Sequence, residues 1–334
     1  METCPDIRLE LLREWLAARF GAGSFSLSPA SADASFRRYF RISVGDRSWI
    51  AMDAPPERED CRPFLRVAAL MRAAGVNVPE ILAQDPERGF LLLTDLGMRT
   101  YLEALDTANA DELFRDAVDA LIRLQRASHP DVLPPYDEAL LRREIDLFPQ
   151  WYLARHIGMT LDAHEREMLA KTATLLVANN LAQPRVYVHR DYMPRNLMVT
   201  DPNPGVLDFQ DAVFGPITYD IVSLLRDAFV SWDEKRVLDW TVRYWEKAKR
   251  AGLPVNADFG TFYRDFEWMG LQRHLKVLGI FARIRHRDGK SGYVEDTPRF
   301  LRYARGVCER YAQLAPLLAL LDRIERRQPS VGYT

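Results

Sequence analysis

The spacing of apolar residues changes from helical to strand-like near the start of the chain. Leu9, Leu12 and Leu16 lie three and four positions apart, which predicts an amphipathic helix. Short runs rich in β-branched and aromatic residues follow, and Gly45-Asp46 between two of them favours a hairpin turn. The predicted order is a helix at residues 7–20, a hairpin of strands 36–44 and 48–54, a helix at 60–74, and two strands at 80–83 and 90–94. This order predicts a small, mostly antiparallel sheet.

Beyond Gly97 the spacing of apolar residues is mainly helical. The predicted helices cover residues 110–128, 137–155, 162–182, 217–230, 233–251, 258–287 and 298–326. Short strand-like runs, separated by loops rich in Pro, Asn and Asp, cover residues 186–188, 197–200 and 206–207. The sequence therefore predicts an α+β protein with two lobes, a small β-rich lobe at residues 1–97 and a larger, mainly helical lobe at 98–334, joined by a hinge near residues 94–98.

Composition and charge argue against several classes of protein. The chain has 334 residues, 48% of them hydrophobic and 28% charged, and a formal charge of -2 gives no overall field to attract nucleic acid or an anionic membrane. The longest apolar run, residues 314–321, is much shorter than the ~20 residues that span a bilayer. Cys4, Cys61 and Cys308 form no metal-binding or disulfide pattern. We expect a cytoplasmic protein, and nothing in the sequence implies a nucleic-acid, membrane or protein partner.

The segment HRDYMPRN at residues 189–196 is the most informative for chemistry. Asp191 and Asn196 are five residues apart on one predicted loop, and Asp208 follows twelve residues later, so a hairpin return would bring the three side chains together. One carboxylate can then accept the proton of an attacking hydroxyl, while an amide and a second carboxylate hold Mg²⁺ against a triphosphate. The pattern favours phosphoryl transfer; the alternative is a polar loop followed by a surface hairpin.

Together, HRDYMPRN and the later segment VLDFQDAVFGPITYDI resemble the catalytic and metal-binding motifs of the aminoglycoside phosphotransferase and choline kinase superfamily, which has the protein-kinase fold. Within it, the segments MDAPPE, FLLLTDLG and FEWMGLQRHLKVLGIFARI are similar to bacterial kinases that act on the anomeric hydroxyl of the amino sugars N-acetylmuramate and N-acetylglucosamine. The resemblance runs from about residue 25 to 326. It implies an ATP- and Mg²⁺-dependent kinase of a small amino sugar in peptidoglycan recycling.

The resemblance also implies roles for individual residues. Asp191 would be the catalytic base, and Asn196 and Asp208 would be the magnesium ligands. His189 and Asp220 would brace the catalytic loop through hydrogen bonds to its backbone.

The predicted nucleotide-binding lobe departs from the family pattern in two ways. The loop that should cover the phosphates has no glycine, and Met52 stands where the phosphate-binding lysine belongs. Because methionine cannot donate a hydrogen bond to phosphate, we expect arginines of the first hairpin to supply the charge, although arginines are also common on a solvated strand face. The candidate nucleotide-binding residues are Ser35, Phe36, Arg37, Arg38 and Arg41, with Thr94, Asp95 and Leu96 as the hinge whose backbone binds adenine. The alternative for the hinge residues is a plain strand end.

The acceptor site is expected beside the catalytic loop, toward the larger lobe. Its candidate residues are Arg195, Asp211, Trp268, Arg273 and Lys276. A cation suits the carboxylate of N-acetylmuramate, and an aromatic ring suits stacking on a pyranose. The alternatives are a solvated helix face, another hydroxyl acceptor such as an aminoglycoside, choline or homoserine, and a catalytically impaired kinase-like regulatory protein.

Overall fold

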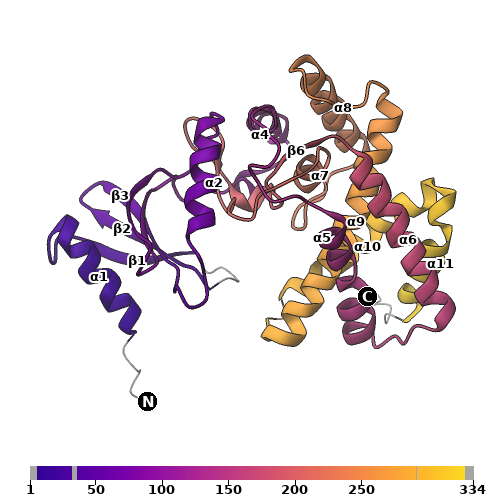
Figure 1. The fold of residues 1–334 in the computed structure, drawn as a ribbon, viewed down its shortest axis with the longest axis horizontal. Helices are drawn as coiled ribbons and strands as arrows, with labels where there is room; N and C mark the ends of the chain where they lie inside the picture. The colour runs from indigo at the N-terminus through magenta and orange to yellow at the C-terminus, as the bar shows by residue number, and fades with distance from the viewer. Residues whose placement is uncertain (1–5, 32–35, 291, 328–334) are drawn as a thin grey trace. The chain divides into compact units, whose positions relative to one another are not determined.

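The computed structural model describes residues 6–31, 36–290 and 292–327, and the chain divides into two compact units (Figure 1). The N-terminal unit comprises Met1–Ala104 with Asn196–Asp211, and the C-terminal unit comprises Leu105–Arg195 with Ala212–Thr334. These units differ from the predicted lobes mainly in residues 196–211, which fold with the N-terminal unit. None of the helices in the described ranges has the length and apolar character needed to cross a membrane.

The N-terminal unit is built on a five-stranded antiparallel sheet with the order β1-β2-β3-β5-β4. Its strands are β1 (Ser26–Ser31), β2 (Arg38–Val44), β3 (Arg47–Asp53), β4 (Ile81–Asp85) and β5 (Phe90–Thr94). The predicted hairpin forms as expected, with Tyr39 opposite Met52 and Arg38 opposite Asp53. Strand β1 was not predicted, because its sequence SLSPAS lacks alternating apolar residues; it forms by pairing with β2.

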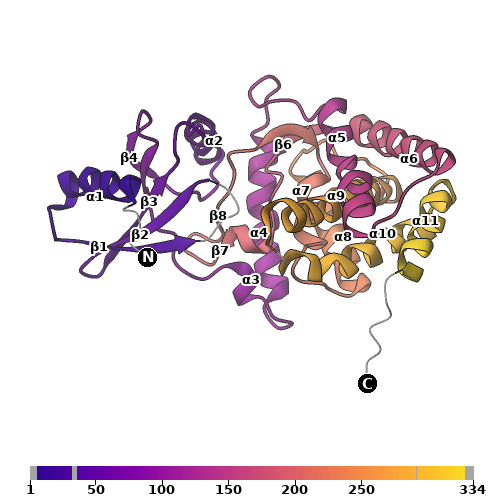
Figure 2. The ribbon, with the colours of Figure 1, turned by 90° about the horizontal axis from the view of Figure 1, so that it is seen from below.

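Helix α1 (Ile7–Phe20) supplies the core of the N-terminal unit on one face of this sheet (Figure 2). Leu12 and Leu16 are fully buried against a set of sheet residues that includes Ile42, Ala51 and Phe90. Burial of such side chains contributes roughly 1.5–3 kcal/mol each, which explains why the predicted amphipathic helix docks here.

A buried carboxylate also joins α1 to the sheet. The side chain of Asp53 is fully buried at the end of β3 and accepts hydrogen bonds from Arg8 Nε and Arg38 Nε, each at 2.9 Å. Removing one partner of such a buried pair leaves an uncompensated charge, so the two arginines and Asp53 depend on one another.

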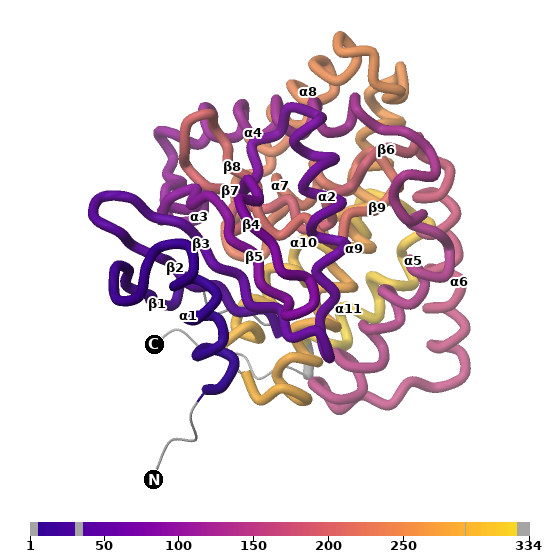
Figure 3. The backbone as a smooth tube through the Cα atoms, turned by 60° about the vertical axis from the view of Figure 1, so that its left-hand side comes forward, coloured from indigo at the N-terminus to yellow at the C-terminus, as the bar shows by residue number. Residues whose placement is uncertain are grey.

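Residues 196–211 form a small hairpin of β7 (Leu197–Met198) and β8 (Gly205–Val206) within the N-terminal unit (Figure 3). The backbone N–H of Val199 donates to the carbonyl of Arg99 at 2.9 Å, just before the short helix α3 (Tyr101–Ala104). Phe64 of α2 (Arg62–Ala73) packs on Phe209 with ring centroids 4.8 Å apart. The segment that carries the predicted magnesium ligands is therefore fixed to the N-terminal unit.

Helix α9 (Phe259–Asp288) is the centre of the C-terminal unit and is buried along most of its length. It packs against helices from most of the unit and against a π-helix, Phe148–His156. The other helices are α4 (Ala110–Arg126), α5 (Glu138–Ile145), α6 (Ala163–Ala182), α7 (Tyr219–Leu225), α8 (Glu234–Arg250), α10 (Thr297–Arg310) and α11 (Ala315–Arg327). The strand pair β6 (Arg185–Val188) and β9 (Val213–Pro216) completes the unit, with 3₁₀ turns at Gly292–Asp296 and Ala312–Leu314. A further 3₁₀ turn, Pro194–Asn196, ends at the first residue of segment 196–211.

Three predicted helices are shorter or broken for local reasons. The predicted helix 137–155 becomes α5 and the π-helix, with Pro149, which lacks an N–H, at the junction. The predicted helix 298–326 breaks at Tyr311, whose backbone is extended. The predicted helix 217–230 ends early, because the side chain of Asp227 accepts the N–H groups of Phe229 at 2.9 Å and Val230 at 3.2 Å.

The packing of α9 leads to a stability prediction. A Cβ at Gly279 would collide with the backbone carbonyl of Leu147, whereas a Cβ at Gly306 of α10 would meet no atom closer than 3.7 Å. We expect Gly279→Ala to lower the free energy of unfolding by about 1–3 kcal/mol through overpacking.

The matched control, Gly306→Ala, should raise the free energy of unfolding by about 0.5–1 kcal/mol, because alanine restricts the unfolded chain. Denaturant unfolding measures both values. Equal effects of the two substitutions would contradict the close packing at Leu147.

Candidate active site

The predicted catalytic loop begins directly after β6, and its backbone is held by one buried carboxylate. Asp220, in the first turn of α7, accepts the backbone N–H of His189 at 2.6 Å on Oδ2 and that of Arg190 at 3.0 Å on Oδ1. The N–H of Asp191 donates to Nδ1 of His189 at 3.3 Å. His189 and Asp220 thus make the kind of backbone contacts that the resemblance implies for them.

Arg190 adopts a backbone conformation that is rare for its residue type. Its φ of 76° lies in the left-handed region, which costs of order 1–3 kcal/mol for a residue with a side chain. The two N–H bonds to Asp220 help to hold this conformation. Burial raises the pKa of Asp220 to about 7, against the opposing effect of the N–H groups of His189 and Arg190.

The residues after Arg190 anchor the loop to the C-terminal unit. Asp191 is partly exposed. Tyr192 is buried and its hydroxyl donates to the carbonyl of Ala117 in α4 at 2.8 Å. The guanidinium of Arg195, at the end of this stretch, lies 5.1 Å from the ring centroid of Phe229.

Asn196 and Asp208 are brought together in the N-terminal unit. Nδ2 of Asn196 donates to Oδ2 of Asp208 at 3.4 Å, and the N–H of Leu207 donates to the carbonyl of Asn196 at 2.9 Å. Gln210 Nε2 donates to the other oxygen of Asp208 at 2.7 Å, and Asp208 itself has a positive φ of 62°. Asp211, the exposed last residue of this segment, is the remaining predicted acceptor contact here.

The chemistry of these two side chains fits magnesium. A carboxylate and an amide oxygen are hard ligands, and Mg²⁺ is usually held by few protein groups together with water and phosphate oxygens. In the ranges that the structure describes, no group of three His, Cys, Asp or Glu side chains is arranged as metal ligands, so a more complete protein cage is not found there. The pair therefore suits a metal shared with a nucleotide.

The position of the missing lysine is closed to solvent. Met52 is fully buried in β3. Arg38 lies on the other face of the hairpin, where its guanidinium pairs with Asp53 and also contacts Asp6. Arg37 directly precedes β2, and exposed Phe36 lies under the guanidinium of Arg58 at 4.7 Å. Ser35 lies outside the described residues.

The predicted hinge is tied to β2 by an ion pair. Asp95 accepts hydrogen bonds from Arg41 Nε at 2.6 Å and Nη2 at 3.1 Å, and Arg41 Nη2 also donates to the carbonyl of Gly97 at 2.8 Å. Burial opposes ionisation of Asp95, but Arg41 and other hydrogen bonds hold its pKa below its ordinary value. Thr94 Oγ1 accepts the N–H of Glu80 at 2.8 Å, and the side chain of Leu96 lies beside Gly205.

The three predicted sugar contacts on α9 are buried within the C-terminal unit. Trp268, Arg273 and Lys276 keep only 5%, 2% and 8% of their surface exposed, so the alternative of a solvated helix face is wrong. Trp268 packs against the ring of Tyr311, and the charge of Arg273 opposes the rise in the pKa of Asp220 caused by burial. Their assignment to sugar binding stays a prediction.

Sequence reasoning missed Glu144, which Lys276 contacts at 2.9 Å. It also missed Tyr136, whose hydroxyl donates to the same carboxylate. A signal was present, because Glu144 falls between Leu141 and Ile145 on the apolar face of a predicted helix. A carboxylate on such a face requires a buried partner.

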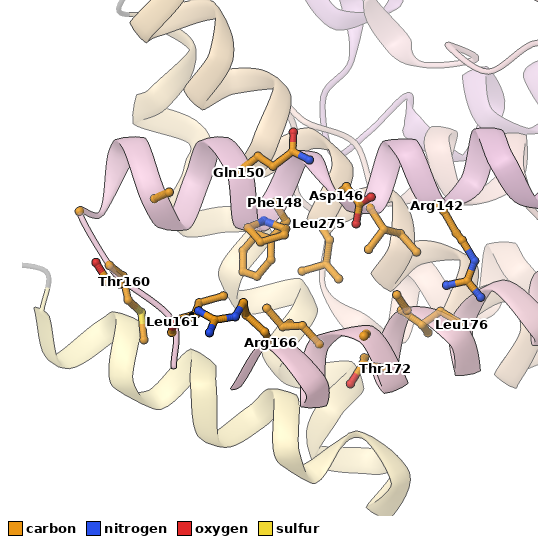
Figure 4. Close-up of a pocket in the computed structure, with 18 residues that line it drawn as sticks. Arg142, Asp146, Phe148, Gln150, Thr160, Leu161, Arg166, Thr172, Leu176 and Leu275 are labelled. Atoms are coloured by element: carbon orange, nitrogen blue, oxygen red, sulfur yellow. Dashed lines mark hydrogen bonds between the residues drawn. The ribbon is translucent and has the colours of Figure 1, made fainter. Parts of the chain in front are cut away.

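A separate cavity of about 580 Å³ lies between α5, the π-helix and α6 (Figure 4). Phe148, Leu161, Leu176 and Leu275 contribute to its mainly apolar lining. None of the predicted catalytic, metal or substrate residues is among those that line it. The cavity is therefore distinct from the predicted catalytic loop within the C-terminal unit.

Comparisons with known proteins agree with this arrangement. The chain is 60% identical over 295 residues to an N-acetylmuramate/N-acetylglucosamine kinase of Pseudomonas aeruginosa, covering 88% of this chain and 87% of the relative. A protein of the same name from Neisseria meningitidis serogroup B is 52% identical over 330 residues, which cover 97% of this chain and 98% of the relative. The ADP-bound crystal structure of an aminoglycoside phosphotransferase superposes with a TM-score of 0.58 at 15% identity, covering 88% of this chain and 97% of that one.

The predicted fold is confirmed by this structural likeness and by the antiparallel sheet and mainly helical C-terminal unit. A family model described as the phosphotransferase enzyme family matches residues 26–255, which is more than half of the chain. The chain therefore belongs to the phosphotransferase enzyme family.

Proposed function

We propose that this protein is a kinase that transfers the γ-phosphoryl group of ATP to the anomeric hydroxyl of N-acetylmuramate and N-acetylglucosamine. The products would be sugar 1-phosphates that re-enter peptidoglycan synthesis. The choice of substrates rests on the 60% identity to a kinase named for these two sugars. The observation that supports the chemistry is the braced loop that presents Asp191.

In this proposal Asp191 acts on the acceptor. Its carboxylate orients the anomeric hydroxyl and accepts its proton as the oxygen attacks the γ-phosphorus in line. An anomeric hydroxyl is more acidic than other sugar hydroxyls, which lowers the demand on the base. Mg²⁺, which Asn196 and Asp208 would hold through oxygen, neutralises charge on the phosphates when bound. In the structure, Nδ2 of Asn196 points toward Asp208. The side-chain amide must therefore leave Asp208 or rotate before its oxygen can bind the metal beside Asp208.

ATP is the proposed donor because the family transfers phosphate and an aminoglycoside phosphotransferase of the same fold binds ADP. The backbone of residues 94–96 would bind adenine. We further propose that the protein works in the cytoplasm, where ATP is abundant; the described cysteines Cys61 and Cys308 are free and buried, which suits that compartment.

The first prediction from this proposal concerns the base. Asp191→Asn cannot accept a proton, so we expect kcat to fall roughly 10²- to 10⁴-fold without loss of the fold. The measurement is ADP release from Mg²⁺-ATP with N-acetylmuramate, N-acetylglucosamine, glucose, kanamycin, choline or homoserine. Turnover of the two N-acetyl sugars, lost in the variant, is expected. Turnover of a different acceptor would keep the chemistry and reject the substrate, and an active variant would reject Asp191 as the base.

The second prediction concerns the charge that replaces the missing lysine. We expect at least one of Arg37→Ala, Arg38→Ala and Arg41→Ala to raise the KM for ATP while the KM for the sugar stays the same. Since Arg38 and Arg41 already pair with carboxylates, binding of phosphate would exchange one anionic partner for another. Arg47→Ala is the matched control, because Arg47 lies in the same hairpin over the ring of Trp49. Unchanged kcat and KM for ATP in all three variants would refute the hypothesis.

The third prediction concerns Asp220. Its folded-state pKa of about 7 lies above the ordinary 3.8, so the unfolded chain loses this proton first as the pH rises. The stability that the protonated group contributes is therefore present below about pH 4 and lost as the pH rises toward 7.

We expect the free energy of unfolding of the wild type, relative to Asp220→Asn, to decrease by on the order of a few kcal/mol between pH 5 and 8. The variant should also have a lower kcat, because an amide offers only one oxygen to two N–H donors. Asp239→Asn, at a half-exposed ion pair of α8, is the control. Parallel stability curves for the wild type and Asp220→Asn would contradict the raised pKa.

A further inference from the structure

A cluster of charged and phenolic side chains lies directly behind the catalytic loop in the C-terminal unit. At its centre the carboxylate of Glu144, from α5, contacts Arg190 Nη2 at 2.5 Å and Lys276 Nζ at 2.9 Å. Lys276 Nζ also donates to the hydroxyl of Tyr219 at 3.0 Å, and the hydroxyl of Tyr136 donates to Glu144. The cluster thus joins α5, α7 and α9 to the loop after β6.

This cluster is too buried to be an ordinary surface ion pair. The side chains of Glu144 and Lys276 keep 6% and 10% of their surface exposed. Burial opposes ionisation of Glu144, but the charges of Lys276 and Arg190 hold its pKa below its ordinary value. Buried ion pairs often contribute little net stability compared with apolar residues of the same size. The cluster is therefore better explained by a need to fix its members in space.

The member that needs fixing is Arg190. Its backbone is in the left-handed region, where glycine or asparagine is usual, and it directly precedes Asp191. Its backbone N–H is held by Asp220, and its guanidinium is held by Glu144. The residue before the proposed base is thus fixed through both its main chain and its side chain, by carboxylates from two different helices.

We propose that Glu144 is a positioning residue for phosphoryl transfer, which holds the catalytic loop by anchoring the guanidinium of Arg190. Lys276 supplies the second cation that keeps Glu144 ionised and oriented. This inference rests on the proposed function, in which Asp191 is the base. It gives the buried Lys276 a role in the loop's support in place of direct contact with the sugar.

The experiment compares Glu144→Gln with Glu138→Gln. Both are the same substitution in α5, but Glu138 makes an exposed pair with Arg142 at 2.7 Å. We expect Glu144→Gln to lower kcat roughly 10- to 100-fold, as for a small misplacement of reacting groups, with the KM values for ATP and sugar changed less than about threefold. Glu138→Gln should match the wild type. Equal kcat values for Glu144→Gln and Glu138→Gln would overturn the proposal.

A second pair of variants keeps the test decisive if Glu144→Gln folds poorly, since that variant leaves two buried cations without a counter-charge. The double variant Glu144→Gln/Lys276→Met has the same net charge in the cluster as the wild type. It is compared with Lys276→Met, from which it differs only at Glu144. Circular dichroism and thermal unfolding establish that both are folded. We expect the kcat of the double variant to be lower than that of Lys276→Met by roughly tenfold or more.

Other outcomes separate this inference from the proposed function. If Lys276→Met raises the KM for N-acetylmuramate but not for N-acetylglucosamine, Lys276 binds the sugar carboxylate and its positioning role is overturned. If the wild type phosphorylates a different acceptor, the proposed substrate fails, and the kcat ratios are measured with that acceptor. A loss of kcat specific to Glu144 would still support the positioning role in that case.

Discussion

The proposed chemistry depends on one constraint, the two hydrogen bonds that the buried carboxylate of Asp220 accepts from the backbone of His189 and Arg190. They hold Arg190 in a conformation that its side chain disfavours, and Asp191 is the next residue. Burial of Asp220 in α7 raises its pKa, so the protein carries an electrostatic cost at the place where it fixes the loop. Such costs are typical of functional sites, where the surrounding fold holds a strained backbone.

Features that depend on neighbours in sequence were predictable. The spacing of Leu9, Leu12 and Leu16 predicts α1, and Gly45-Asp46 predicts the β2–β3 hairpin. Strand β1 was missed because its pairing with β2, and not its own residues, makes it a strand. The early end of α7 was missed because it depends on the side chain of Asp227 accepting N–H groups that would otherwise continue the helix.

In the candidate site, too, groups close together in the sequence were predictable and contacts between distant segments were not. The spacing of His189, Asp191, Asn196 and Asp208 was sufficient to predict phosphoryl transfer, because those groups lie on one loop and the following hairpin. Glu144 is 46 residues from Arg190, so no local pattern links them. The polar residues of α9 were recognised as unusual, but periodicity alone could not show that the helix is buried on nearly all sides. That burial changes Lys276 from a candidate surface contact into a member of an interior charge cluster.

The most direct test of the central claim is the position of the phosphate in the product. The purified protein is incubated with Mg²⁺-ATP and N-acetylmuramate or N-acetylglucosamine, and the product is examined by ³¹P and ¹H NMR. A phosphorus coupled to the anomeric proton, from a phosphate at C1, is the result that the account predicts. Phosphate at another carbon, or no sugar phosphate despite binding of ATP, would contradict it.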